Sequence, residues 1–387
     1  MQADVIVVGL GAMGSAAAWQ LARRGARVLG IDRYAPPHDQ GSSHGLTRVT
    51  REAVGEGEAY APLVRRSHAI WRELEAELGP DQEGPLMART GVLVIGPAGS
   101  DTAFVARTRA VAQAFGVPHE ALAAADLRRR WPQFRIDDGE AGCFEPGGGV
   151  VYPERCIAAQ LAMARRAGAQ LHTDEPVHAI EREGGAFRVQ TALGTHHAVQ
   201  VLVTAGAWLP GLAAAVVDNG LPWARELRVL RQVLHWLAPR PGHEAAFEPG
   251  RCPTFIVTRG ERYEDTFYGM PRVDGSGGVK VGTERFEHDT TPEAVAREVT
   301  DAETTELFER LVRPRLPGLS GQALRGSACL YTMAADGRFR IGETEPGLTW
   351  VSACSGHGFK HSAALGEALA ERLLEGRSAI DLSPFAA

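Results

Sequence analysis

The sequence predicts an α/β protein in which a nucleotide-binding domain with a parallel sheet is interleaved with an α+β domain built on an antiparallel or mixed sheet. A strand, a glycine turn, a helix and a second strand open the chain, and a comparable strand, glycine turn and helix close it. Between them, from about residue 227 to 285, short alternating strands are typical of an antiparallel sheet. We therefore expect residues 1–85, 147–217 and 327–387 in the first domain, and residues 86–146 and 218–326 in the second.

The opening segment ADVIVVGLGAMGSAAAWQLARRGARVLGIDR has the pattern of a βαβ unit. An apolar strand runs into Gly9, Gly11 and Gly14, and after the helix a second strand ends at Asp32. Such glycines permit a tight turn, close approach of the backbone to a pyrophosphate and close packing of helix on strand. Asp32 stands where a carboxylate accepts hydrogen bonds from ribose hydroxyls. The unit predicts a dinucleotide site, with an incidental glycine turn as the alternative.

The segments that follow depart from a plain Rossmann repeat. The loop APPHDQGSSHG leads into TRVTRE instead of another βαβ turn, which favours a flavin dinucleotide over NAD. A buried strand at 201–210 stops at Ala205 and Gly206, where backbone again approaches a cofactor, and this strand must return to the sheet of the first domain. The pattern also predicts, in order, a helix at 60–78, a strand at 91–96, helices at 101–115 and 119–130, a helix from 153 to about 168 and a helical span at 292–312.

Composition and charge exclude several classes of protein. The 387 residues are 44% hydrophobic and carry a net charge of -6, enough for two cores and without the basic balance of a nucleic-acid-binding protein. No apolar run reaches transmembrane length, so no membrane association is expected. The five cysteines lack CxxC spacing, which argues against a disulfide framework or zinc site and favours the reducing cytoplasm. We expect no metal, and a monomer.

Five motifs carry a resemblance to a known family: GLGAMG, GSSHGLTRVTR, VLVTAGAW, SACLYT and SGHGFKHS, in this order. With them the chain resembles the monomeric sarcosine oxidase and N-methyl-amino-acid oxidase family, with its pipecolate oxidase relatives, over nearly its whole length. The resemblance implies a Rossmann-type FAD-binding domain of the glutathione-reductase and D-amino-acid-oxidase type, carrying FAD attached through a cysteine thioether. It implies that the cofactor contacts Gly9, Gly11, Gly14, Asp32, Arg33, Ser43, Arg48, Val177, Ala205, Gly206, Trp208, Cys329, Gly356, Gly358, Phe359 and Lys360.

Cys329, in ACLYT, has two interpretations. By itself a lone cysteine in a strand is most simply a small buried hydrophobe. The resemblance instead matches Cys329 to the attachment cysteine of the family. This chemistry is reasonable because a thiolate is a competent nucleophile toward a flavin methyl carbon, and nearby positive charge helps to form the thiolate.

Only two of the 41 basic residues are lysines, Lys280 and Lys360, and both fall on motif positions. A compact ammonium beside a ligand cannot be replaced by a planar guanidinium. The resemblance implies that Lys360 and Arg51 bind the substrate carboxylate and fix its orientation. It also implies that Lys280 activates oxygen by stabilising superoxide. The alternatives are a solvated lysine at a helix start for Lys360 and a solvent-facing strand lysine for Lys280.

Five further residues complete the expected site. His44 and Arg48 match residues near the isoalloxazine, where cations stabilise reduced flavin, although His44 alternatively satisfies only its own loop. Tyr268 and Tyr331 resemble tyrosines that line the substrate pocket, but buried tyrosines of a core are equally common. Glu284 stands where relatives that oxidise sarcosine carry a histidine. This departure puts sarcosine in doubt, because a carboxylate repels a substrate carboxylate and instead suits a cationic amine or a polar side chain.

These assignments predict an FAD-dependent oxidase of N-substituted (N-methyl) or cyclic secondary α-amino acids. Hydride passes from the substrate to the flavin, water hydrolyses the resulting imine, and O2 is reduced to H2O2. No protein acid or base is obligatory if the site selects the neutral amine. The alternatives are a primary amino-acid or glycine-type oxidase, a flavin dehydrogenase with another acceptor, and a non-catalytic flavin- or NAD-binding sensor. A sensor has no need of two cations that orient a carboxylate.

Overall fold

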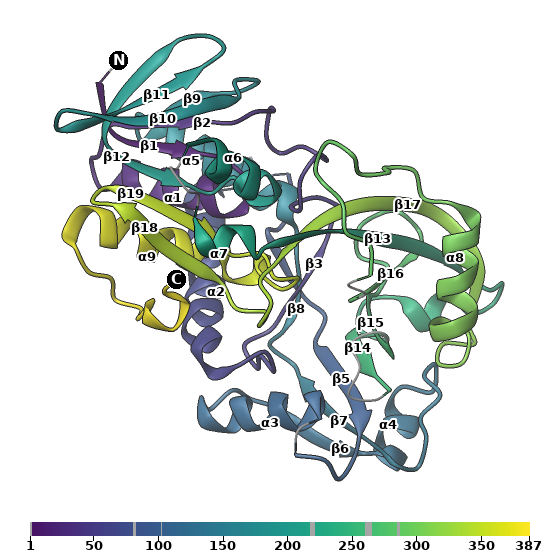
Figure 1. The fold of residues 1–387 in the computed structure, drawn as a ribbon. Coiled ribbons are helices and arrows are strands. Elements are labelled where there is room, and N and C mark those ends of the chain that lie inside the picture. The colour runs from purple at the N-terminus through teal and green to yellow at the C-terminus, as the bar shows by residue number, and fades with distance from the viewer. Residues whose placement is uncertain (1, 80–82, 102, 217–220, 260–264, 285–286) are drawn as a thin grey trace.

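The computed structural model describes residues 2–79, 83–101, 103–216, 221–259, 265–284 and 287–387. Its strands form two eight-stranded sheets and a three-stranded sheet. Figure 1 shows two lobes, each built around one of the large sheets, with both ends of the chain in the same lobe. None of the helices within these ranges is long and apolar enough to cross a lipid bilayer.

The first large sheet contains the N-terminal unit and is mostly parallel. Its order is β10-β11-β12-β1-β2-β9, and β19, which pairs with β18, adds to β12. Strand β12 runs parallel to β1, with Val201 opposite Ile6, which confirms that the strand ending before Ala205 returns to this sheet. The strands are β1 (Gln2–Val8), β2 (Val28–Ile31), β9 (Gln170–His172), β10 (Val177–Glu183), β11 (Ala186–Thr191), β12 (Thr195–Val203), β18 (Arg340–Glu345) and β19 (Leu348–Ser352).

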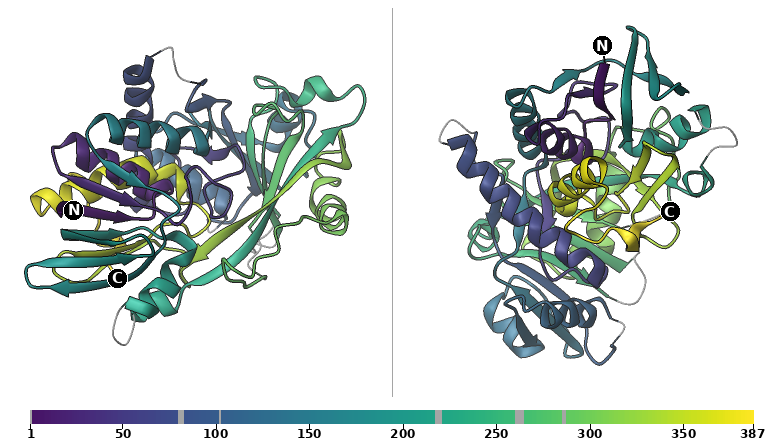
Figure 2. Two further views of the ribbon diagram at one scale, coloured as in Figure 1. Left: turned by 90° about the horizontal axis from the view of Figure 1, so that it is seen from above. Right: turned by 90° about the vertical axis from the view of Figure 1, so that its left-hand side faces the viewer.

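Three helices lie against this sheet: α1 (Ala12–Arg23), α5 (Pro153–Arg166) and α9 (Ser362–Glu375). Figure 2 shows α1 and α9 side by side. A Cβ atom on Gly366 of α9 would lie only 2.4 Å from the Cβ of Ala16 in α1. Small residues at this contact therefore let the two helices approach closely, and the glycine turns at both ends of the chain meet at one edge of the sheet.

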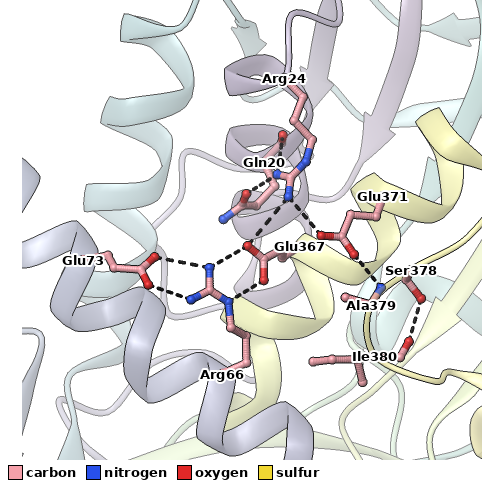
Figure 3. A network of polar contacts seen from close by, with 9 residues as sticks. All are labelled: Gln20, Arg24, Arg66, Glu73, Glu367, Glu371, Ser378, Ala379 and Ile380. Carbon is pink, nitrogen blue, oxygen red and sulfur yellow. Dashed lines mark hydrogen bonds and ion pairs between the residues drawn. The ribbon is translucent and has the colours of Figure 1, made fainter.

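Helix α2 (Ala61–Leu78) packs beside α9 and is joined to it by a polar network (Figure 3). Arg66 of α2 donates to Glu73 on its own helix and to Glu367 of α9, at 2.6 Å each. Arg24, at the end of α1, donates to Glu371 at 3.2 Å. The network ties the three helices together on the surface of the lobe.

The second large sheet is mixed, as predicted. Its order is β17-β13-β16-β15-β14-β5-β7-β6, in which only the β14 and β5 pair is parallel. Strands β13 and β17 are long and run back from this sheet toward the first lobe (Figure 1). The strands are β5 (Val92–Pro97), β6 (Glu120–Ala123), β7 (Glu140–Glu145), β13 (Arg228–Pro239), β14 (Thr254–Thr258), β15 (Thr266–Met270), β16 (Val279–Thr283) and β17 (Leu319–Met333).

A small sheet and several short helices complete the described structure. Strands β3 (Arg48–Thr50), β8 (Gly149–Val151) and β4 (Met87–Arg89) pair in the order β3-β8-β4 and lie between the lobes. The shorter helices are α3 (Phe104–Ala114), α4 (Ala124–Arg130), α6 (Leu209–Val216), α7 (Pro222–Arg225) and α8 (Asp301–Leu307), with a π-helical turn at Phe308–Val312 and 3-10 turns at Glu58–Tyr60, Gly206–Trp208, Glu244–Phe247, Phe359–His361 and Ser383–Phe385.

Two of the predicted helices are wrong in part. Residues 120–123 form the edge strand β6, whose backbone pairs with β7, so α4 begins only at Ala124. The helical span predicted at 292–312 begins only after Thr300, which forms a capping box with Glu303 and so sets the helix N-terminus. The helix predicted at 101–115 is α3, and residue 102 lies outside the described residues, as does the domain boundary placed at 217/218. The division into two domains stays a prediction.

Candidate active site

A cavity of about 960 Å³ lies between the two lobes and collects most of the predicted site residues. Four of them are not among its lining residues: Gly14, His44, Lys280 and Cys329. Residues of the wall come from the N-terminal glycine turn, the segment 41–51, strands β15 and β17, the residue that follows β16 and the turn before α9. The predicted residues on the wall are Gly9, Gly11, Asp32, Arg33, Ser43, Arg48, Arg51, Val177, Ala205, Gly206, Trp208, Tyr268, Glu284, Tyr331, Gly356, Gly358, Phe359 and Lys360.

The N-terminal glycine turn has the geometry of a phosphate cradle. Gly9 has φ +89° and a Cβ there would lie 2.7 Å from the carbonyl oxygen of Thr204. A Cβ on Gly14 would lie 1.7 Å from the carbonyl oxygen of Gly9. Gly11, by contrast, lines the cavity, where an added Cβ would meet only the Ser43 hydroxyl at 3.9 Å, and caps α1 without a side-chain hydrogen bond. The first N–H groups of α1 are thus available to a bound anion.

Asp32 and its neighbours lie at the next part of the wall. The Asp32 carboxylate accepts hydrogen bonds from the backbone N–H of Leu10 at 2.6 Å and of Tyr34 at 2.9 Å, which leaves a lone pair on each oxygen. The guanidinium of Arg33 lies 5.7 Å from the ring of Trp208. The indole N–H of Trp208 is buried and has no hydrogen-bond partner in the described part of the chain. The Asp32 carboxylate is therefore placed to accept hydrogen bonds from a ligand, and the Trp208 indole N–H is placed to donate one.

A cluster of His172, Glu175 and His196 supports the same edge of the first sheet. The three side chains have the residue types of a metal site, but the Glu175 carboxylate already hydrogen-bonds His172 at 2.9 Å and His196 at 2.8 Å. The backbone N–H of Glu175 donates to the carbonyl of Asp32 at 2.9 Å. The cluster thus braces the loop between β9 and β10, which lies beside Asp32 and leads into Val177 on the cavity wall.

Lys280 is buried, only 1% exposed, so its interpretation as a solvent-facing strand lysine is wrong. Its ammonium donates to the carbonyls of Gly45 at 2.7 Å and Thr47 at 2.5 Å, and lies 3.3 Å from the Thr47 hydroxyl. Within the described residues it has no carboxylate partner. Burial and the charge of Arg48 lower the pKa of Lys280 well below its ordinary value.

The loop that Lys280 holds also carries Arg48 and His44. The Arg48 guanidinium donates to the carbonyls of Ser42 at 2.7 Å and Thr47 at 2.9 Å. His44 is buried, and its Nε2 has no hydrogen-bond partner among the residues that the structure describes. Burial, followed by the charge of Arg48, lowers the pKa of His44 to about 3, so its ring is neutral at physiological pH. The alternative in which His44 satisfies only its own loop leaves this nitrogen unexplained.

Cys329 is buried on β17, on the same face as Tyr331 two residues later. Burial raises the pKa of the Cys329 thiol, and the charges of Arg48 and Lys280 oppose that rise. A second cysteine, Cys354, is partly exposed and lies on the cavity wall. Because Cys354 lines the cavity and Cys329 packs in the same cluster without lining it, the two cysteines must be compared by experiment.

Arg51 and Lys360 meet at one end of the cavity, joined by a carboxylate that the sequence reasoning missed. Glu56 accepts from Arg51 at 2.7 Å and from Lys360 at 3.0 Å, and Lys360 also donates to the carbonyl of His357 at 2.9 Å. Burial alone would raise the pKa of Glu56, but the two cations hold it well below its ordinary value. The group carries two positive charges and one negative charge, so one positive charge is in excess. Lys360 is buried, which makes its interpretation as a solvated helix-start lysine wrong.

Tyr268 and Tyr331 form a pair on the cavity wall. Their hydroxyl oxygens are 3.4 Å apart. The ring of Tyr268 covers Gly282, where an added Cβ would lie 2.6 Å from the Tyr268 hydroxyl. Burial raises the pKa of Tyr268 to about 12 and that of Tyr331 well above its ordinary value. Both hydroxyls therefore stay protonated and can donate hydrogen bonds into the cavity.

Glu284 follows β16 and reaches the cavity wall. Its side chain is partly exposed. Burial, followed by the negative charge of Glu56, raises the pKa of Glu284 to about 7.

Three further residues of the site were missed from the sequence. Glu154 accepts from the backbone N–H of Gly45 at 2.7 Å and of Leu46 at 2.9 Å, which holds the loop above Lys280. The ring of Phe104 lies 5.4 Å from the Arg51 guanidinium. Glu56 is the third. The only signal for Glu56 and Glu154 in the sequence is that each stands near a glycine or basic motif. This is weak evidence for a site residue, because most such glutamates are solvated.

The cavity wall fits FAD on three observations. The glycine turn and the uncapped start of α1 accommodate a pyrophosphate. Buried polar atoms of His44 and Trp208 lack partners among the described residues, which is typical of groups that a ligand satisfies. Arg48 and Lys280 place positive charge beside Cys329, where a reduced flavin would carry negative charge.

Comparison with known proteins agrees with this fit. The chain matches the family described as FAD dependent oxidoreductase (DAO) over residues 4–372. It is 37% identical over 386 residues to a monomeric sarcosine oxidase of Streptomyces avermitilis, covering 99% of this chain and 96% of that protein. It is 35% identical over 394 residues to an N-methyl-L-tryptophan oxidase of Salmonella arizonae, covering 100% of this chain and 98% of that protein.

Solved structures show the same fold. NikD, an unusual amino acid oxidase essential for nikkomycin biosynthesis, superposes with a TM-score of 0.82 at 25% identity, covering 100% of this chain and 97% of that chain. An L-proline dehydrogenase from P. horikoshii superposes with a TM-score of 0.82 at 21% identity, covering 100% of this chain and 96% of that chain. The predicted fold class is thereby confirmed. The chain belongs to the FAD dependent oxidoreductase family, in the group that contains the monomeric sarcosine oxidases and N-methyl-L-tryptophan oxidases.

Proposed function

We propose that this protein oxidises N-substituted (N-methyl) or cyclic secondary α-amino acids, with FAD as cofactor and O2 as acceptor. The meeting of Arg51 and Lys360 in the cavity carries the proposal, because Glu56 balances only one of their two charges. One excess positive charge suits a substrate carboxylate. The relatives named for sarcosine and N-methyl-L-tryptophan support an N-methyl amino acid as substrate.

The side chains around this carboxylate site orient the rest of the substrate. Held between Arg51 and Lys360, a carboxylate loses rotational freedom, so the nitrogen and its substituent keep a fixed direction. The hydroxyls of Tyr268 and Tyr331 face the same cavity as hydrogen-bond donors. The ring of Phe104 adds an apolar wall for a side chain or an N-substituent.

When bound, FAD supplies a hydride acceptor for the carbon next to the nitrogen, returns the electrons to O2 and so yields H2O2. The chain holds the cofactor through the glycine turn for the pyrophosphate and Asp32 for the ribose. Arg48 and His44 lie where the ring system belongs. The ammonium of Lys280 donates to two backbone carbonyls, which favour its charged form, and in that form it stabilises superoxide. Water hydrolyses the imine product.

Covalent attachment of FAD through Cys329 is part of the proposal. A bond between its Sγ and a flavin methyl carbon requires the thiolate, which the positive charges of Arg48 and Lys280 favour. Acid precipitation tests this bond. We expect the wild-type pellet and the Cys354→Ser pellet to stay yellow, whereas Cys329→Ser releases its flavin. Release of all colour from the wild-type protein would show that the cofactor is not covalent.

The overall function is tested with a panel of sarcosine, N-methyl-L-tryptophan, pipecolate, proline and glycine. We expect a secondary amino acid to bleach the flavin without oxygen and to give one H2O2 per imine in air. Preferred oxidation of glycine would favour the primary amino-acid oxidase alternative, and bleaching without peroxide would favour a dehydrogenase. A flavin that no amino acid bleaches would indicate the non-catalytic sensor. A single peak at the monomer mass in light scattering checks the expected monomer.

A further inference from the structure

Glu284 presents to the cavity a carboxyl group that has no hydrogen-bond or ion-pair partner among the described residues. Side chains alternate along β16, so Lys280 and Gly282 share a face, and Glu284 continues that face just past the strand. The ring of Tyr268 fills the space over Gly282 between them. Within the described part of the chain, no hydrogen bond or ion pair reaches the Glu284 carboxyl. Because unpaired carboxyls in a cavity are costly, this group points to a ligand.

The charges around Glu284 restrict what that ligand carries. Arg51, Lys360 and Glu56 together leave one excess positive charge, which the proposed substrate carboxylate neutralises. An ionised Glu284 then remains as one negative charge without a protein partner. The groups that act on it from neighbouring elements are Arg51, Glu56, Lys360, Tyr268 and Tyr331.

An amino acid enters the cavity as a zwitterion, with an ammonium as well as a carboxylate. The ammonium supplies the positive charge that balances Glu284. Hydride loss, however, requires the free amine, whose lone pair assists the departure of hydride from the neighbouring carbon. The zwitterion must therefore lose one proton inside the cavity before oxidation.

We propose that Glu284 is the base that takes this proton, an inference that rests on the proposed function. The N–H bond of the substrate ammonium breaks with its electron pair remaining on nitrogen, and an O–H bond forms on the Glu284 carboxylate. A charged pair becomes a neutral amine and a neutral carboxylic acid, with atoms and charge conserved. This role revises the expectation from the sequence that no protein base is needed.

The protonation behaviour of Glu284 supports the same role. Burial, then the charge of Glu56, raises its pKa to about 7. A general base works best when its pKa is near the working pH. The amine pKa is about 10 in water, like that of lysine, and a cavity that disfavours charge lowers the cost of forming the neutral pair. Above pH 7 the carboxylate is ionised and ready to accept the proton.

The first test follows anaerobic flavin reduction across pH in the wild-type holoenzyme and in Glu284→Gln. The substrate is the panel member that the wild-type enzyme reduces fastest. We expect wild-type reduction to rise with pH through about 7. In Glu284→Gln the rise moves toward the amine pKa, so reduction is about 100-fold slower at pH 7 and converges with wild type near pH 10. The exposed Glu287→Gln is the matched control and keeps the wild-type profile.

Profiles that run parallel at all pH values would overturn the proposal, because a merely structural role for Glu284 lowers the rate without moving the pH dependence. A wild-type enzyme whose flavin no secondary amino acid reduces would instead contradict the proposed function. The two failures are therefore distinguishable.

A second test measures binding without turnover. Betaine and 3,3-dimethylbutanoate have the same shape and carboxylate, but only betaine carries a positive nitrogen. We titrate oxidised holoenzyme with each compound at pH 8.5 and follow binding by the flavin spectrum. The two dissociation constants then differ only through the positive charge on the betaine nitrogen. We expect wild type to prefer betaine by about 10-fold, and Glu284→Gln to lose that preference while binding 3,3-dimethylbutanoate as before.

Equal preference in wild type and Glu284→Gln would place Glu284 away from the substrate nitrogen and overturn the proposal. Nα-methyl-lysine and Nα-methylnorleucine form a second matched pair. A preference for Nα-methyl-lysine that is lost in Glu284→Gln, with the betaine preference unchanged, would assign Glu284 to a side-chain cation and would also overturn it.

Discussion

Two networks of arginine, lysine and glutamate in this protein have the same chemistry but different surroundings. The surface network of Figure 3 joins Arg24 and Arg66 to glutamates of α2 and α9, and these arginine side chains are 25% and 34% exposed. The cavity network joins Arg51, Glu56 and Lys360, whose cationic side chains are only 3% and 4% exposed. Both hold their partners at hydrogen-bond distance.

The difference lies in what an unbalanced charge costs. The surface network has two arginines and three glutamates, and water and salt screen its excess negative charge at little cost. The cavity network has an excess positive charge beside the unpaired Glu284, where burial makes both expensive. An imbalance that solvent cannot screen indicates a charged ligand, whereas the surface imbalance indicates only a solvated helix face.

The largest expected effect comes from breaking the cavity network at Lys360. In Lys360→Met, Arg51 and Glu56 neutralise each other, so no positive charge is left for a carboxylate ligand. We expect the dissociation constant of 3,3-dimethylbutanoate to rise about 10³-fold, or about 4 kcal/mol. Arg65→Met, which removes an exposed arginine of α2, is the control and leaves binding unchanged. A change of less than threefold in Lys360→Met would remove this residue from the carboxylate site.

Lys280 sharpens the comparison, because it is a buried cation with no carboxylate beside it in the described structure. We expect Lys280→Met to slow reoxidation of the flavin by O2 about 100-fold, since its ammonium no longer stabilises superoxide. Anaerobic reduction by the amino acid, measured in the same variant by stopped flow, should change far less. Equal losses in both half-reactions would contradict a role toward oxygen.

The cost of burying Glu284 should appear in the pH dependence of stability. Its pKa in the folded protein is about 7, above the ordinary 4.5, so between these values the folded state binds more protons than the unfolded state. Stability conferred by the protonated form is therefore lost as pH rises through this window. We expect Glu284→Gln holoenzyme to be more stable than wild type by about 2 kcal/mol at pH 8 and equally stable at pH 4.

Urea unfolding at both pH values measures this difference. Glu287→Gln, which removes an exposed carboxylate, should show no such dependence. A gain of the same size at both pH values would mean that the glutamine improves packing and that Glu284 titrates normally.

The smallest effect is expected at the surface. Arg66→Met removes both ion pairs of Arg66 and should destabilise the protein by about 1 kcal/mol or less at low salt, a difference that shrinks at high salt. Flavin reduction should be unchanged. If Arg66→Met proved as damaging as Lys360→Met, exposure would not be what separates the two networks.

Much of the fold was predictable because its signals are local. The glycine turn at Gly9, the apolar strand before it and the helix after it are encoded within a few residues, and the structure places them as predicted. The failures were also local conflicts. Residues 120–123 have a helical composition, yet pairing with β7 makes them an edge strand. Helix-forming residues before Thr300 led us to predict a helix from residue 292, but the capping box of Thr300 and Glu303 sets the helix start later.

The candidate site was predictable only in part. Arg51, Lys280 and Lys360 stood out through motifs and the scarcity of lysine. Glu56 did not, because nothing near it in sequence shows that Lys360, 304 residues away, completes its ion pairs. Glu154 and Phe104 were missed for the same reason.

By itself, the sequence determined the dinucleotide-binding unit, the alternation of apolar and polar residues in the strands of the second sheet, and the residue types available for chemistry. The first two follow from the sequence because backbone conformation and burial patterns depend on neighbouring residues. Only the tertiary structure decided which charges meet. Among the described residues, it buried Lys280 without a carboxylate partner, balanced one of two cations with Glu56, and left Glu284 facing the cavity unpaired. Electrostatic balance depends on distance in space and on exclusion of water, and neither is a property of any short stretch of chain.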